Sequence, residues 1–368
     1  MVEAVEAMPD RSASDKQSVA LALALGGGGA RGLAHLAVLE ILEAEGIRPT
    51  LLAGTSFGGL VGALFACGLS AQDIVAAARG FRFPHRFLPG RVLVWDEIFP
   101  TAASILAGRT FADLDSPLAV SAVDLLAGEE VVLHSGPLLP AIRATCAVPG
   151  VFAPEQLDGR HLVDGGVTNV LPVDLALFWD PDVVIAVNIV TSPRRSLPLN
   201  SRYARIATAL GRLVPNPMTA HLAYEVAMRA VEVALDRQRA LAIAMTGPEV
   251  LIDIDLGSIS IGDFHRLDEV LEIGRAATMV ALPGLRMALA RPCAVARSSG
   301  KFTLHVDPVC RMAVSPHRAR ARLERDGITY YFCSMNCRDN FERHGNRYVG
   351  MRPPCVSRMS PGGLESEG

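Results

Sequence analysis

Residues 21–42 read LALALGGGGARGLAHLAVLEIL, and this stretch places four consecutive glycines between an apolar run and a segment with helical spacing. The run before the glycines is typical of a strand, and residues 30–46 repeat their apolar positions as a helix that ends at Gly46 does. Four glycines cost conformational entropy and offer no side chain for packing. We therefore expect something to approach this backbone so closely that a side chain would not fit.

The chain beyond the glycines continues to alternate short apolar runs with helix-like segments. Strand-like runs occupy residues 49–56, 117–125, 129–135, 182–190 and 249–256, and helix-like segments occupy residues 58–68, 202–213, 218–245 and 267–282. This alternation predicts an α/β domain with a mostly parallel sheet, in which the run 182–190 is buried on both faces. Residues 81–109, with three prolines and five aromatic residues, fit less well. They predict an irregular insertion that either caps an apolar cleft or forms a surface loop with its own small cluster.

Composition excludes several classes of protein. The chain has 368 residues, of which 50% are hydrophobic, and a net charge of -3, which argues against a protein that works by neutralising nucleic-acid phosphates. The acidic N-terminus does not resemble a secretory leader, and no apolar run reaches the roughly 18 residues of a spanning helix. Seven unevenly spread cysteines indicate reduced thiols or metal ligands. We expect a cytoplasmic protein without a nucleic-acid partner, and peripheral contact with the inner face of a membrane stays open.

The segment GTSFG, residues 54–58, matches the Gly-x-Ser-x-Gly pattern of a nucleophile elbow. In that pattern a sharp turn between a strand and a helix exposes the serine oxygen, and the small residues let neighbouring backbone pass close. Here a strand-like run precedes Ser56 and a helix-like segment follows it. The helix would place backbone N–H groups and a positive dipole beside the serine. We interpret Ser56 as a candidate nucleophile.

The glycine run offers backbone donors for an oxyanion, but a dinucleotide-binding loop must be weighed against this. Gly27, Gly29 and Gly32 have the spacing of that fingerprint, which also requires an acidic residue about 20 positions further on. The segment RPTLLAGTS supplies none, and no Lys-Ser/Thr pair follows the glycines as a P-loop requires. An oxyanion loop is the favoured interpretation.

A serine nucleophile also needs a base. Asp164 follows a short apolar run and precedes two glycines, so it stands at a strand end on a tight turn, although Asp-Gly is also a common turn dipeptide. A triad would need a later histidine, and none of the available ones lies in a segment suited to that role: His221, His265, His305, His317 and His344. His35 and His161 are interpreted as packing or surface histidines, and Asp124 and Asp174 as ordinary loop or surface residues.

Taken together and in this order, GGGGARG, GTSFG and DGG resemble the three signature blocks of the patatin-like phospholipases, and residues 145–173 extend the match into the aspartate. The resemblance covers most of residues 20–285. It implies a three-layer α/β/α domain with a mostly parallel central sheet. It also implies a lipid acyl hydrolase that cleaves carboxylic esters without a cofactor.

The resemblance further implies a Ser–Asp dyad in place of a triad. Ser56 would attack the ester carbonyl to form an acyl-enzyme, and Asp164 would accept the serine proton and then activate water. The elbow would comprise Gly54, Thr55, Phe57 and Gly58, and the aspartate block Asp164, Gly165 and Gly166. The oxyanion loop would comprise Gly27, Gly28, Gly29, Ala30, Arg31 and Gly32. Whether Arg31 acts by charge or orients the loop stays open, and Gly26 lies outside the block.

A second constellation lies near the C-terminus. Cys310 follows a short strand-like run, and Cys333 and Cys337 are four residues apart, which would put both sulfurs on one side of a first helical turn. Thiolates there could bind zinc or another transition metal, with His317, His344, Asp307 or an open position as the fourth ligand. Three buried free cysteines are the alternative. The arginines in HRARARLERD, residues 317–326, indicate a solvated face rather than a phosphate site.

Residues 304–350 resemble the small YHS domain, through DPVC-x-M and YYFCS-x-x-C-x-x-x-F, although Arg311 replaces the usual glycine after the first cysteine. The resemblance links Cys310, Cys333 and Cys337 to metal binding in a small α+β unit. We therefore divide the chain into a tail at 1–18, a hydrolase domain at 19–290, a linker at 291–303, the metal-binding unit at 304–350 and a tail at 351–368. The rival functions are a lipid-binding protein with a degenerate site, a metal sensor, and a Ser-His-Asp hydrolase.

Overall fold

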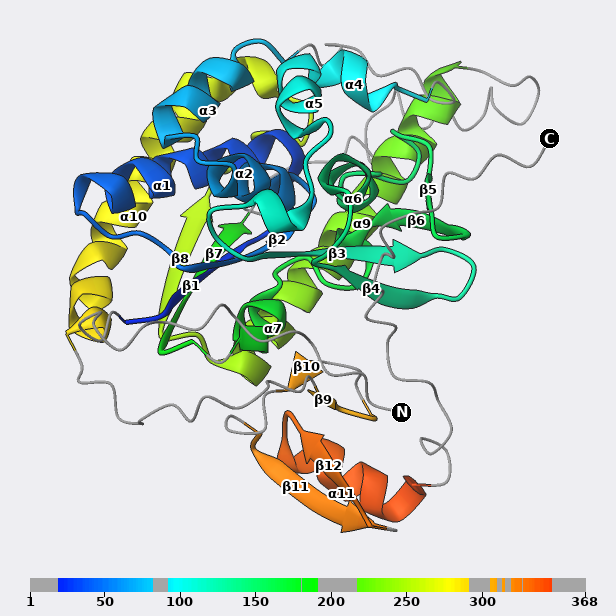
Figure 1. Cartoon of the computed structure of the whole chain (residues 1–368). Helices are drawn as coiled ribbons and strands as arrows, with labels where there is room; N and C mark the ends of the chain where they lie inside the picture. Colours follow the sequence, from blue (N-terminus) through cyan, green and yellow to red (C-terminus); the bar gives the residue numbers. More distant parts are fainter. Residues whose placement is uncertain are drawn as a thin grey trace.

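A computed structural model describes residues 19–81, 92–179, 181–190, 217–290, 305–309, 313–314, 319–325 and 327–345. Its larger part is an eight-stranded sheet in the order β5-β6-β3-β2-β1-β7-β8, with β4 paired to β3 (Figure 1). The strands are β1 (Leu21–Leu25), β2 (Leu51–Thr55), β3 (Leu118–Asp124), β4 (Glu129–Leu133), β5 (Glu155–Leu157), β6 (Arg160–Asp164), β7 (Val183–Val190) and β8 (Val250–Asp255). The predicted helix at 202–213 lies outside the described residues.

The central strands are parallel, as the alternation of apolar runs predicts. β1 pairs in parallel with β2 and β7, β2 with β3, and β7 with β8, whereas β4, β5 and β6 pair antiparallel at one side. All residues of β1 and β2 are buried, and so are the first seven of β7, which confirms that this strand is covered on both faces. A polar face would be incompatible with helices on both sides of the sheet.

Helices cover both faces and make three layers (Figure 1). One face packs against a large apolar core with the helices α1 (Ala34–Ala44), α2 (Phe57–Ala66), α3 (Ala71–Ala78), α6 (Leu138–Thr145) and α10 (Leu267–Leu289). The other face packs, through the small residues Ala22, Ala24, Ala53 and Ala186, against α7 (Val173–Ala176) and the long helix α9 (Pro217–Thr246). The three-layer α/β/α class that the resemblance implies is confirmed.

Two parts of the fold differ from the sequence predictions. The insertion at 81–109 contains two short helices, α4 (Trp95–Ile98) and α5 (Pro100–Leu106), whose buried side chains join the core. Helix α10 continues through Pro283 to Leu289, because Leu282, Leu285 and Ala288 stay buried along its inner face while Pro283 is exposed. Tertiary packing outweighs the local signal to stop at the proline.

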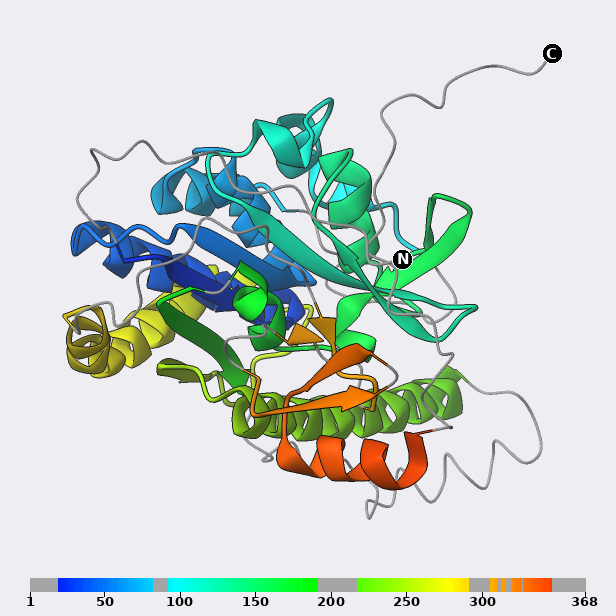
Figure 2. The same cartoon turned by 60° about the horizontal axis from the view of Figure 1, so that its bottom comes forward.

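The C-terminal unit is small and of α+β type. It contains β9 (His305–Val306), β10 (Ala313–Val314), β11 (Ala321–Arg325), β12 (Ile328–Phe332) and α11 (Met335–His344), with Phe332 and Phe341 at the centre of its core. Met245, near the end of α9, packs against this core, and the unit lies beside α7 and α9 (Figures 1 and 2). Within the described part of the chain, no helix combines the length and the hydropathy needed to cross a bilayer.

Candidate active site

Ser56 occupies the turn between β2 and α2. β2 ends at Thr55 and α2 begins at Phe57, so Ser56 lies between them with φ 54° and ψ -127°, a region that L-residues avoid. Its N–H donates to the Thr145 Oγ1 at 2.8 Å, which helps to hold the strained turn. The turn aims the serine at the N-terminal end of α2, where the helix dipole favours negative charge. This is the geometry of a nucleophile elbow.

Two glycines of the signature blocks are required by their surroundings. A Cβ on Gly58 would collide with the carbonyl group of Leu25, so only glycine lets α2 pack onto the end of β1. Gly29 has φ +58°, and a Cβ there would lie 2.6 Å from the Ile261 carbonyl oxygen. The groups that approach the glycine backbone closely, as the sequence predicts, therefore include other parts of this chain.

The amides of the glycine loop are not equally available. The Gly27 N–H donates to the Val170 carbonyl at 2.8 Å, the Ala30 N–H to the Ile261 carbonyl at 2.8 Å, and the Arg31 N–H to the Gly28 carbonyl at 3.2 Å. The amides of Gly28 and Gly29 donate to no other group in the described residues. Of the six residues predicted for the oxyanion loop, these two present the amides best able to meet an oxyanion.

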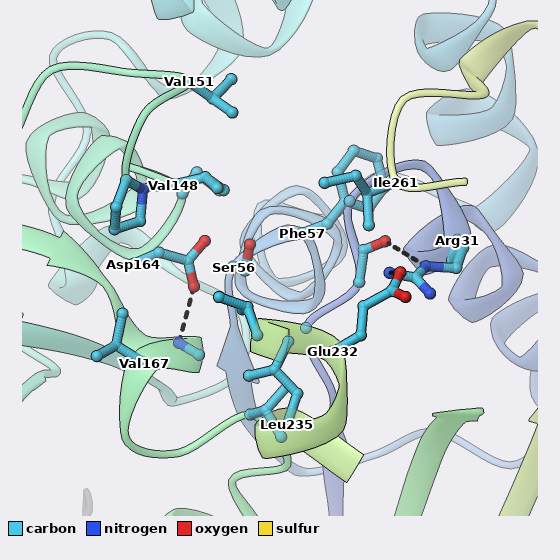
Figure 3. Close-up of a pocket in the computed structure, with 18 of the residues that line it drawn as sticks. Arg31, Ser56, Phe57, Val148, Val151, Asp164, Val167, Glu232, Leu235 and Ile261 are labelled. Atoms are coloured by element: carbon cyan, nitrogen blue, oxygen red, sulfur yellow. Dashed lines mark hydrogen bonds and ion pairs between the residues drawn. The ribbon is translucent and has the colours of Figure 1, made fainter. Parts of the chain in front are cut away.

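Asp164 ends β6 beside the serine. Ser121 of β3 pairs with Thr55, and the next residue of β3, Ala122, pairs with Asp164, so the register sets the carboxylate next to the elbow. Asp164 Oδ1 accepts the Gly166 N–H at 2.7 Å, and Oδ2 is buried without a hydrogen-bond partner in the described residues. Figure 3 shows the Asp164 carboxylate directed toward Ser56.

The environment of Asp164 suits a base that works near neutral pH. Burial raises the pKa of Asp164 from 3.8 to about 6, although the Ser56 hydroxyl and the Gly166 N–H both favour its charged form. The carboxylate is therefore the main form at pH 7, and its proton affinity is higher than that of an exposed aspartate. An unsatisfied Oδ2 with this pKa can accept the serine proton.

A buried network of polar side chains surrounds Asn169, which follows the Asp-Gly-Gly turn. The Asn169 Nδ2 donates to Asp174 Oδ1 at 2.8 Å and to Glu130 Oε1 at 3.0 Å, and the Thr55 hydroxyl donates to the Asn169 carbonyl at 2.8 Å. Burial and the nearby Asp174 raise the pKa of Glu130 to about 7. The prediction that Asp174 is an ordinary loop or surface residue is wrong, since it is only 4% exposed and joins this network. No local pattern in the sequence predicts this network, because Glu130 and Thr55 are 39 and 114 residues away from Asn169 along the chain.

Ser56 and Asp164 open into one pocket of about 980 Å³, part of it open to solvent. Its wall is mostly apolar, and Val148, Val151, Val167, Leu235 and Ile261 surround the two polar side chains in Figure 3. Such a lining fits a hydrocarbon chain better than a polar substrate.

The insertion at 81–109 contributes to this pocket. Phe99 lines it and also packs against Phe57, Phe81 and Phe264 in an edge-on aromatic cluster, with ring centroids 4.9–6.3 Å apart. Of the two interpretations of this segment, the described residues favour a wall of the cleft. The aromatic residues Phe83 and Phe87 lie outside the described residues.

Helix α9 contacts both the glycine loop and the segment after the Asp-Gly-Gly turn. Glu232 of α9 forms an ion pair with Arg31 at 3.5 Å, and the Arg31 Nε donates to the Gly28 carbonyl at 3.3 Å. Six residues along α9, the Gln238 side chain donates to the Val167 carbonyl at 2.8 Å, just after the Asp-Gly-Gly turn. The Arg31 side chain is only 4% exposed. These contacts hold the Arg31 side chain against the glycine loop. Nothing in the sequence singles out Glu232 or Gln238.

No histidine side chain in the described part of the chain lines the pocket. His35 is buried, with its Nε2 2.7 Å from the Gly26 carbonyl oxygen, and burial lowers its pKa to about 4. His305 stacks on Tyr331 in the C-terminal unit. His317 lies outside the described residues, as does the side chain of His221.

Two of the three predicted metal ligands lie together. The sulfurs of Cys333 and Cys337 are 3.7 Å apart, and a carboxylate oxygen of Asp307 lies with them inside a cluster 4.8 Å across. Two thiols and a carboxylate are donors that zinc accepts. Burial, Asp307 and Cys333 raise the pKa of Cys337 to about 12, so a metal would have to displace the thiol proton. Cys310 lies outside the described residues, and His344 is exposed.

A three-layer α/β/α fold with a strained serine between a strand and a helix defines the class of α/β proteins that carry a nucleophile elbow. Comparison with known proteins specifies the class further. Residues 23–177 match the family of patatin-like phospholipases, and residues 305–352 match the YHS domain. The chain therefore contains a patatin-like phospholipase domain followed by a YHS domain.

Individual proteins are similar to parts of this chain. An uncharacterised NTE family protein of Mycobacterium tuberculosis is 38% identical over 175 residues, which cover 46% of this chain and 49% of that protein. The patatin-like phospholipase domain-containing protein 7 of Rattus norvegicus is 28% identical over 69% of this chain and 20% of its own length. The chain spans about half the length of the mycobacterial relatives that it matches. The structure of VipD from Legionella pneumophila overlaps 73% of this chain and 67% of that chain, with a TM-score of 0.41 and 14% identity.

Proposed function

We propose that this protein is a lipid acyl hydrolase that cleaves carboxylic esters through Ser56 and Asp164. The observation that carries the proposal is the strained serine beside a buried carboxylate with one unsatisfied oxygen, both opening into an apolar pocket. The family supports this activity, because its members are described as phospholipases. The apolar wall points to a fatty acyl ester as the substrate class.

The reaction proceeds in two halves. The Ser56 Oγ attacks the ester carbonyl carbon while its proton moves to Asp164 Oδ2, and the amides of Gly28 and Gly29 stabilise the oxyanion. The C–O bond to the leaving group then breaks, and Asp164 returns the proton to the departing alcohol. In the second half, water gives a proton to Asp164 and attacks the acyl-enzyme carbonyl carbon. The bond from that carbon to Ser56 Oγ then breaks, Asp164 gives its proton to Ser56 Oγ, and the fatty acid is released.

Two substitutions test the assignment. Ser56→Ala and Asp164→Asn should each lower the turnover of a short-chain p-nitrophenyl ester by on the order of 10³-fold or more. Ser104→Ala and Asp158→Asn, which change exposed residues of the same types, should leave turnover unchanged. A fluorophosphonate probe should label the wild type and not Ser56→Ala. Full turnover in Ser56→Ala would refute the nucleophile, and an inactive wild type would favour a lipid-binding protein with a degenerate site.

The C-terminal unit supports a second, independent function in metal binding. This proposal rests on the cluster of Asp307, Cys333 and Cys337, to which we add Cys310 as a proposed ligand. Asp307 already accepts the N–H groups of Val309 and Cys333, so it is held in place for a metal. Elemental analysis of the purified full chain should find about one zinc or other transition metal per chain. Cys333→Ser should remove it, and Cys67→Ser, in the hydrolase domain, should retain it.

We further propose that the two domains join near residues 291–303 and that the protein contacts membranes peripherally from the cytoplasmic side. The apolar pocket supports the membrane contact, because its substrate would be drawn from a lipid phase.

A further inference from the structure

Helix α9 is amphipathic in the reverse sense of an ordinary surface helix. A helix at a protein surface normally turns its apolar side chains inward and its charged ones to water. Of the α9 side chains that the structure describes, the exposed ones are apolar apart from Arg237: Val226, Ala230, Val231, Val233, Ala234, Arg237, Ala240, Leu241 and Ala244. Val226, Val233 and Leu241 are 41–56% exposed.

The other charged side chains on the described part of α9 are buried or half-buried, and each forms an ion pair. Arg229 pairs with Glu232 at 3.1 Å, and Glu232 also pairs with the buried Arg31. Arg239, only 6% exposed, pairs with Asp236 at 2.7 Å. Glu232 and Gln238 join α9 to the loops of the candidate site, whereas the other two ion pairs lie within the helix itself. Apart from Arg237, the outer face presents apolar side chains to water, and a partner of apolar character would suit it.

This face is continuous with the mouth of the pocket. Val231 of α9 and Val167 of the Asp-Gly-Gly turn both line the pocket, and they are 49% and 48% exposed. An apolar surface thus runs from the outside of α9 into the site of Ser56. Figure 2 shows α9 along one side of the molecule, with the C-terminal unit lying against part of it.

We propose that the exposed face of α9, defined by Val226, Val231, Val233, Arg237 and Leu241, docks onto a lipid bilayer and opens the pocket directly to it. This inference rests on the proposed hydrolase function. A fatty chain could then pass from the bilayer to Ser56 without crossing water. Arg237, the one charged residue on this face, would extend to anionic headgroups while its stem lies among the apolar side chains. The arrangement is that of an interfacial helix.

The test measures binding and catalysis separately on the full chain. Binding is measured by co-sedimentation with vesicles of ether-linked phosphatidylcholine and phosphatidylglycerol, which have no ester to cleave. Val233→Glu with Leu241→Glu should weaken binding at least about tenfold, while turnover of a soluble p-nitrophenyl ester stays within about twofold of the wild type. The matched control is Val280→Glu with Met287→Glu on α10, on the other side of the sheet, where the two side chains are 83% and 66% exposed. This control variant should bind the vesicles as the wild type does.

A second variant covers the case in which the charged variant does not fold. Val233→Trp should bind these vesicles more tightly and shift its fluorescence to the blue on binding, whereas Val280→Trp should not. The proposal is overturned if the wild type does not bind the vesicles, or if Val233→Glu with Leu241→Glu binds as the wild type does. It is also overturned if those substitutions turn a dimer into a monomer in light scattering, because the face would then bind a second copy. Absence of soluble-ester turnover in the wild type would refute the hydrolase function and leave the binding result intact.

Discussion

Replacing the proposed base should make this protein inactive and more stable. Asp164 is 6% exposed, and its pKa rises from 3.8 to about 6 on folding. Each pH unit of difference corresponds to about 1.4 kcal/mol, so the ionised carboxylate costs about 3 kcal/mol of folding free energy at neutral pH. Asp164→Asn keeps an oxygen for the Gly166 N–H and carries no charge. At pH 8 it should therefore be up to about 3 kcal/mol more stable than the wild type.

The effect should depend on pH in a defined direction. Because the folded pKa lies above the unfolded one, the stability that neutral Asp164 contributes is fully present below about pH 4 and is lost as the pH rises through about 6. The advantage of Asp164→Asn should therefore vanish toward pH 4 and be complete by pH 8. Glu130, whose pKa is about 7, titrates in the same pH range, but its titration changes the folding free energy of both proteins equally.

Thermal unfolding of the two proteins across this pH range provides the measurement. For a domain of this size, 3 kcal/mol corresponds to a rise in Tm of about 6–12 °C at pH 8. In the wild type, kcat/KM for a soluble ester should rise with pH around a midpoint near 6, because only the carboxylate accepts the serine proton. The Glu130→Gln variant should keep that midpoint. Equal stability of Asp164→Asn and wild type at pH 8, or a kcat/KM that is flat through pH 6, would refute the reasoning.

Two other substitutions test the contacts that position Ser56 and Arg31. Thr145→Val keeps the shape of the side chain but leaves the buried Ser56 N–H without its acceptor, which should cost about 1–3 kcal/mol of stability and lower kcat. Thr145→Ser should restore both the stability and kcat. If Thr145→Val has the Tm and kcat of the wild type, this hydrogen bond does not hold the elbow. Glu232→Gln removes the partner of Arg31 and should lower kcat roughly tenfold, or about 1.4 kcal/mol, with little change in KM. Its control, Glu269→Gln, breaks an exposed pair with Arg266 on α10 and should have no effect; equal losses in both variants would argue against a positioning role.

Most of the fold could be predicted from the sequence because its signals are local. Alternating apolar runs and helical segments predict the parallel strands, and the run at 182–190 predicts its own burial on both faces. Where tertiary contacts compete with a local signal, the prediction is less accurate. The extension of α10 beyond Pro283 and the short helices in the insertion are examples, because buried side chains contributed by distant elements stabilise them.

The residues of the candidate site also differ in whether the sequence can predict them. Ser56 and Asp164 can be selected from sequence, because an elbow and a strand-end Asp-Gly turn each need small residues at fixed spacing. Thr145, Asn169 and Glu232 could not be selected. Each is an ordinary residue until folding brings it to its partner, and the partner of Thr145 is 89 residues away along the chain.

The sequence by itself determined the class of fold, the order of the three signature blocks and the two residues we propose for catalysis. The tertiary structure alone decided which amides of the glycine loop are already engaged, because Gly27 and Ala30 donate to the carbonyls of Val170 and Ile261, which are far away in the sequence. It also decided that α9 exposes Val226, Val233 and Leu241, whereas most of its described charged side chains form ion pairs. Helical periodicity shows which residues share a face, but only packing against the sheet and the catalytic loops determines which face meets the solvent.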